Sequence, residues 1–149
     1  MKKLLDYLES CWYPHAYSSL YLGLCYFNGQ CVEQNYKKAI EYFEYAMEQG
    51  SIEAYTMLGI FNESGYGMPK NLGYALALYK FAADHGDIAA MLNLSELLIK
   101  GGEFGTAKEY LTKARDLGST EAADRLKKLP KRRLQRAGFS ITVGDQRIL

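Results

Sequence analysis

A period of 36 residues restricts the fold of this 149-residue sequence more than any other feature. At that shift "YLGLCYFNG" (21–29) falls on "MLGIFNESG" (57–65), and "YKKAIEYFEYAMEQG" (36–50) falls on "LGYALALYKFAADHG" (72–86). A third copy continues four of the matched series at a shift of 32, as Ala107, Ala114, Gly118 and Ala122. Tandem repetition of this length predicts similar units that stack on their neighbours.

Each copy reads as two helices joined by a loop. The first helix has apolar residues at helical spacing, and a glycine series (Gly29, Gly65, Gly101) marks its end, where a left-handed residue is needed. The second helix repeats small and aromatic residues and ends at Gly50, Gly86 and Gly118. Ser51, Asp87 and Ser119 follow in one equivalent place, which predicts an N-cap for the next first helix.

The stretch "SGYGMPKN" (64–71) has the glycines and the lysine of a phosphate-binding loop. Such a loop follows a strand and leads into a helix, whereas this one follows a helix. Its equivalents in the other copies are "NGQCVEQN" and "GGEFG", so we interpret it as a turn between helices.

The repeated pattern resembles the Sel1-like repeat, a relative of the tetratricopeptide repeat with a longer loop between its helices. Leu22, Gly23, Tyr26, Gly29 and Ala39 carry the resemblance in the first copy, and it covers roughly residues 3–129. The third copy departs from it, with Ser95 in place of glycine and a short loop. The repeats and the resemblance together predict an all-α, right-handed α-solenoid of three helix-turn-helix repeats with capping helices. The expected divisions are a capping helix at 1–14, an array at 15–129 (repeats 15–50, 51–86 and 87–118, capping helix 119–129) and a basic tail at 130–149.

Several classes of function find no support in the sequence. No apolar run is long enough to span a membrane, and Asp6 and Glu9 interrupt the start of the chain too early for a secretory signal. Cys11, Cys25 and Cys31 match no zinc pattern, and the cysteine pair that links repeats in some secreted relatives is missing, because Ser19 holds the second position. We therefore expect reduced thiols in a bacterial cytoplasm, no metal or cofactor, and no enzyme, since no nucleophile–base pair can be named.

The resemblance implies an interaction module whose first helices line a concave face. By tetratricopeptide geometry, the face is predicted to carry Tyr17, Leu20, Leu24 and Phe27, then Glu53, Thr56, Ile60 and Glu63, then Ala89, Leu92, Glu96 and Ile99. An apolar end beside three carboxylates favours a protein or peptide partner with an apolar anchor and basic residues. Packing of the apolar end against the N-terminal helix, with solvated glutamates, is the alternative.

The tail is the one strongly basic segment. Residues 131–149 have five basic residues against Asp145. We expect this segment to be disordered, to dock on the chain itself, or to bind a partner through Arg132, Arg133 and Arg136. One short basic run does not predict nucleic-acid binding. We therefore expect a non-catalytic adaptor or scaffold, or alternatively a bacterial immunity protein that neutralises a toxin by binding it. The oligomeric state is left open.

Overall fold

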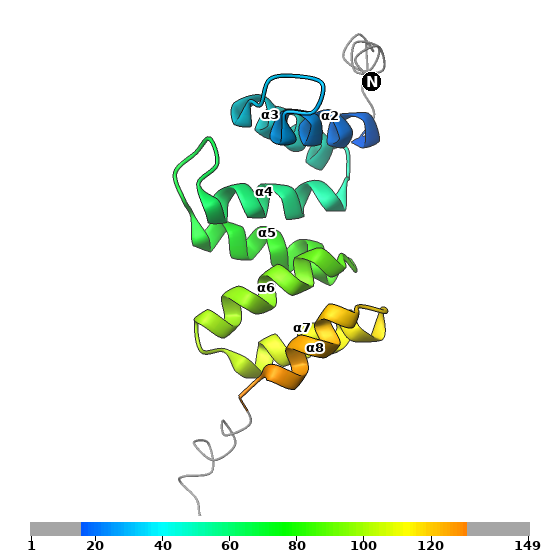
Figure 1. Ribbon diagram of the computed structural model, residues 1–149, viewed down its shortest axis with the longest axis vertical. Coiled ribbons are helices and arrows are strands. Elements are labelled where there is room, and N and C mark those ends of the chain that lie inside the picture. Colours follow the sequence, from blue (N-terminus) through cyan, green and yellow to red (C-terminus); the bar gives the residue numbers. More distant parts are fainter. Residues whose placement is uncertain (1–15, 131–149) are drawn as a thin grey trace, which may run out of the picture. The chain divides into compact units, whose positions relative to one another are not determined.

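A computed structural model of the chain describes residues 16–130, the side chain of Tyr17 excepted, and these residues form helices and no strand (Figure 1). The helices are α2 (Ala16–Asn28), α3 (Tyr36–Glu48), α4 (Ile52–Ser64), α5 (Leu72–Asp84), α6 (Ile88–Lys100), α7 (Phe104–Asp116) and α8 (Thr120–Lys128). The chain divides into two compact units between Leu94 and Ser95, within α6. The capping helix expected at 1–14 and the tail at 131–149 lie outside the described residues.

The predicted N-caps are confirmed. The Ser51 hydroxyl accepts a hydrogen bond from the Ala54 amide at 3.3 Å, and the Ser119 hydroxyl accepts one from the Ala122 amide at 3.1 Å. The Asp87 carboxylate accepts one from the Ala90 amide at 2.9 Å. Two caps that we did not predict, Asn35 and Asn71, do the same for the second helices α3 and α5. All five place a side-chain oxygen over amides that the first turn leaves unpaired.

The glycine stops are confirmed with one correction. Gly50, Gly86 and Gly118 have φ angles of 94°, 93° and 104° after the second helices, and Gly29 and Gly65 have 68° and 76° after the first. In the third copy the left-handed residue is Gly102 (φ 83°) and not Gly101. The Gly101 amide still bonds back to the Leu97 carbonyl at 3.0 Å, so the helical path runs one residue further before the chain turns.

In the first unit, glycine lets an aromatic ring of the second helix pack directly on the first helix. α2 packs on α3, α4 packs on α5, and α3 also contacts α4 (Figure 1). A Cβ atom added at Gly23 would lie 2.5 Å from the Phe43 ring, and one added at Gly59 would lie 2.5 Å from the Tyr79 ring. Both rings are fully buried. The repeated glycine is therefore a packing requirement of the helix pair.

An aromatic cluster around Phe61 joins the first two copies. The ring centroid of Phe61 lies 5.2 Å from that of Phe27, 5.5 Å from Phe43, 5.6 Å from Tyr66 and 5.9 Å from Tyr36. Tyr66 also stacks on Tyr36 at 4.9 Å. Tyr66 therefore packs within the protein.

The second unit holds the last turns of α6 with α7 and α8, and α7 packs on α8. Its buried residues include Ala107, Tyr110, Leu111 and Ala114 on α7. Ser95 and Leu111, both fully buried, hold the positions that glycine and an aromatic ring hold in the other copies. The side chain gained at Ser95 thus accompanies the loss of the ring, which keeps the packed volume similar.

Candidate protein-binding surface

The first unit contains a small depression that brings together two of the predicted contact residues, Leu20 and Glu53. Its volume is about 190 Å³, and its walls are Ala16, Leu20, Gln49, Gly50, Ser51 and Glu53. Leu20 is half-buried, and Glu53 is exposed in the first turn of α4. The Ser51 hydroxyl donates to the Glu53 carboxylate at 3.3 Å. The depression therefore sets an aliphatic wall beside an accessible negative charge.

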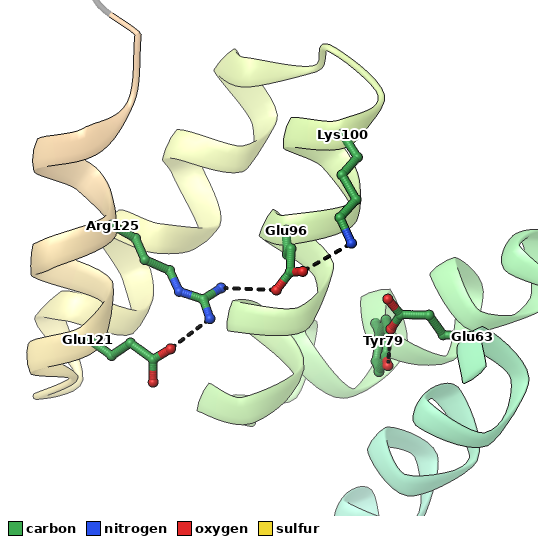
Figure 2. A network of polar contacts seen from close by, with 6 residues as sticks. All are labelled: Glu63, Tyr79, Glu96, Lys100, Glu121 and Arg125. Atoms are coloured by element: carbon green, nitrogen blue, oxygen red, sulfur yellow. Dashed lines mark hydrogen bonds and ion pairs between the residues drawn. The ribbon is translucent and has the colours of Figure 1, made fainter. Parts of the chain in front are cut away.

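Glu63 has a partner inside the protein. The Tyr79 hydroxyl donates to Glu63 Oε1 at 2.8 Å, as Figure 2 shows. Tyr79 is fully buried and Glu63 is half-buried, so this hydrogen bond satisfies the phenol at the edge of the core. One carboxylate oxygen of Glu63 thus holds the ring that packs on Gly59.

Thr56 and Phe27 contribute to the interior. Thr56 is 4 % exposed, and its hydroxyl donates to the Asp87 carboxylate at 2.7 Å, the same carboxylate that caps α6. Phe27 packs in the aromatic cluster around Phe61. Their contacts therefore serve the fold, and we leave both out of the proposed binding surface.

The remaining predicted positions in the first unit are partly accessible. Leu24, Ile60 and Leu92 are half-buried, and Ala89 is exposed. Tyr21 on α2 is half-buried, and the pKa of its phenol is raised first by burial and then by the neighbouring Cys25. Aliphatic side chains with some exposure can contribute to a contact surface, and these residues stay predictions.

The second unit brings together the other predicted pair, Glu96 and Ile99. They line a depression of about 320 Å³ with Lys100, Arg125, Lys128, Leu129 and Pro130. Glu96 forms ion pairs with Lys100 at 3.0 Å and with Arg125 at 3.8 Å, and Arg125 also reaches Glu121 at 2.6 Å (Figure 2). Glu96 is therefore shared between two cations.

Sequence reasoning missed the contribution of α8 to this depression. The shift of 32 residues that relates the third copy to the second also carries Glu96 onto Lys128 and Leu97 onto Leu129. The sequence predicts a capping helix at 119–129, and this register also places its face beside that of α6. The place of Lys128 near Glu96 could therefore be predicted from the repeat register, whereas the contact of Arg125 with Glu96 is seen only in the structure.

Other predicted contacts lie outside the described residues: the Tyr17 side chain and Arg132, Arg133 and Arg136 of the tail. Between residues 16 and 130 there is no group of three or more histidine, cysteine or acidic residues that could hold a metal ion. In the same range, no helix has the length and the hydropathy needed to cross a membrane.

Comparison with known families assigns the repeats. The model of the Sel1 repeat matches residues 16–51, 52–87 and 88–119, which hold the helix pairs α2–α3, α4–α5 and α6–α7. The chain belongs to the Sel1 repeat family. A comparison with curated proteins gave no match.

Solved structures with the same architecture support the assignment of fold. A Sel1 repeat protein from Oxalobacter formigenes superposes with a TM-score of 0.76 at 24 % identity, over 85 % of this chain and 54 % of that one. A protective antigen of uropathogenic Escherichia coli with an SLR fold gives 0.71 at 23 % identity, over 74 % of this chain and 25 % of that one. This Sel1 repeat chain thus spans about half and a quarter of these two proteins. The predicted family and the predicted all-α solenoid are confirmed.

Proposed function

We propose that this Sel1 repeat chain is a non-catalytic binding module that holds a segment of a partner protein on the surface of its first helices. Sel1 repeat proteins generally mediate protein–protein interactions. The observation that carries the proposal for this chain is the depression in which half-buried Leu20 lies beside exposed Glu53. Leu24, Ile60 and Leu92 are the other partly exposed aliphatic residues that we assign to the surface in the first unit.

The chemistry of the Leu20 and Glu53 depression suits a segment with one apolar side chain next to a basic one. Complete burial of an aliphatic side chain supplies about 1.5–3 kcal/mol. An ion pair of a lysine or arginine with exposed Glu53 adds about 0–1 kcal/mol. The apolar anchor therefore supplies most of the affinity, and Glu53 selects the charge of the partner.

A charge reversal at Glu53 tests the proposal. We expect affinity capture from a lysate of the source organism, read by mass spectrometry, to recover partners with the wild-type chain and to lose them with Glu53→Lys. The matched control is Glu44→Lys, which makes the same charge change at an exposed position of second helix α3. Equal loss with both variants would indicate a general charge effect. Retention with both would place binding on another surface.

The same capture separates the two roles that the sequence left open. An adaptor is expected to recover several partners in modest amounts. An inhibitor, such as a bacterial immunity protein, is expected to recover one toxin in a fixed ratio. The cytoplasmic location, the Tyr17 contact and the tail contacts through Arg132, Arg133 and Arg136 stay predictions.

A further inference from the structure

The depression of the second unit differs in charge from that of the first. Three of its seven lining residues are cations, Lys100, Arg125 and Lys128, and one is an anion, Glu96. Glu96 already pairs with two of those cations, while Glu121 pairs with Arg125 from outside the depression. A positive excess therefore remains at the rim even when Glu121 is included.

Part of the lining of the depression is apolar. Ile99 and Leu129 line it and are both half-buried. Leu126 on α8 repeats a position that is buried in the other copies, where Leu22, Leu58 and Leu94 are 0–3 % exposed, yet it is only half-buried. Within the described residues α8 has no second helix of its own, so part of its apolar face lacks the cover that α3 gives α2 and α5 gives α4.

We propose that this depression binds an acidic segment of a partner protein, with an apolar side chain seated between Ile99 and Leu129. Carboxylates on either side of the anchor then meet Lys128 and the Lys100 and Arg125 pair. The site is independent of the Leu20 and Glu53 site, because it lies in the other unit and takes a ligand of opposite charge. The adjoining segment of this chain, residues 131–136, has the same sign as the rim, so charge complementarity favours a separate acidic ligand.

Two neighbouring lysines on α8 offer a matched test. Lys128 lines the depression, whereas Lys127 pairs with Asp124 and does not line it. The probes are three acetylated peptides: Asp-Glu-Leu-Glu-Asp, the same peptide with serine for leucine, and Lys-Lys-Leu-Lys-Lys. Each peptide is titrated into three isotope-labelled full-length proteins: the wild type, the Lys128→Glu variant and the Lys127→Glu variant. The chemical shifts of the backbone amides are recorded at each step. Far-UV circular dichroism checks that both variants keep their helices.

We expect the acidic leucine peptide to shift the amide signals of residues 96–100 and 125–129, and to bind more tightly than the other two peptides. Lys128→Glu replaces an attraction with a repulsion, so it should weaken binding about three- to tenfold, while Lys127→Glu changes it less than about twofold. Glu53→Lys should leave this titration unchanged, so the test of the second depression does not depend on the outcome of the test of the Leu20 and Glu53 site.

Three results would overturn the proposal. One is the absence of shifts up to millimolar acidic peptide, and another is equal weakening by the two lysine variants. The third is movement of the same signals in the unliganded chain when Phe139 and Ile141 are replaced by serine, because the chain's own C-terminal segment would then occupy the depression.

Discussion

Replacing Gly59 with alanine should destabilise the first unit, although alanine is the better helix former. The new Cβ would lie 2.5 Å from Cε1 and 2.7 Å from Cδ1 of Tyr79. The ring is fully buried, and its hydroxyl is held by Glu63 at 2.8 Å, so it has little freedom to withdraw. α4 must therefore move away from α5 to admit one methyl group.

The structure sets the size of the effect. Overpacking of a buried contact costs about 1–3 kcal/mol, and alanine returns up to about 1 kcal/mol of helix propensity. A Cβ only 2.5 Å from a ring carbon is a severe overlap, so we place the cost at about 2–3 kcal/mol, and the expected net loss is about 1–2 kcal/mol in the free energy of unfolding. With a urea m-value of about 2 kcal/mol/M, the unfolding midpoint falls by about 0.5–1 M.

A double-mutant cycle isolates the contact. Tyr79→Leu copies the leucine that the third copy has at Leu111, where Ser95 takes the place of glycine. In that background Gly59→Ala should be neutral or stabilising by up to about 1 kcal/mol, which gives a coupling energy of about 2 kcal/mol. Urea unfolding followed by circular dichroism at 222 nm measures all four variants. The control is Gly73→Ala on α5, where the nearest atom to an added Cβ is 3.6 Å away.

The reasoning would be refuted if Gly59→Ala raised the midpoint as much as Gly73→Ala does. It would also fail if the cost of Gly59→Ala were the same with tyrosine and leucine at position 79, because the ring contact would then not be its origin.

Two further changes separate structural residues from binding residues. Asp87→Ala should lower the free energy of unfolding by about 2–3 kcal/mol, because it removes the cap of α6 and leaves the Thr56 hydroxyl unpaired in the interior. Thr56→Val should lower it by only about 1 kcal/mol, and thermal melts of the two variants measure the difference. Phe27→Ala should lower the free energy of unfolding by about 2 kcal/mol, because it removes a ring from the aromatic cluster. A calorimetric melting temperature equal to that of the wild type would show that Phe27 is instead free to meet a partner.

Much of the fold was predictable because it depends on local backbone chemistry that the repeats display three times. Ser51, Asp87 and Ser119 cap helices because each hydroxyl or carboxylate stands where unpaired amides begin. Gly101 shows the limit, because two adjacent glycines can both take the left-handed turn and the sequence does not say which one does.

The binding surface was less predictable because residues at equivalent positions of different repeats can lie in different environments. Leu20, Thr56 and Leu92 are equivalent by the period of 36, yet Thr56 is buried and bonded to Asp87 while the two leucines keep some exposure. The threonine side chain is short enough to be covered, but its buried hydroxyl needs a hydrogen-bond partner. The burial of Thr56 therefore depends on Asp87, 31 residues away. Periodicity gives the face of a helix but not the reach of each side chain.

The sign of charge on such a face depends on pairing across helices. Glu96 counted alone suggested an acidic groove. Lys100, one turn later on α6, could have been recognised from its i,i+4 spacing as a neutralising partner. Glu96 and Lys100 balance each other on α6, so the positive excess of the depression comes from Arg125 and Lys128 of α8, and only the structure shows that Arg125 lies beside Glu96. Because ion pairing redistributes charge within each unit, the charge of a partner should be inferred for each depression separately, and the Glu53 and Lys128 reversals should select ligands of opposite sign.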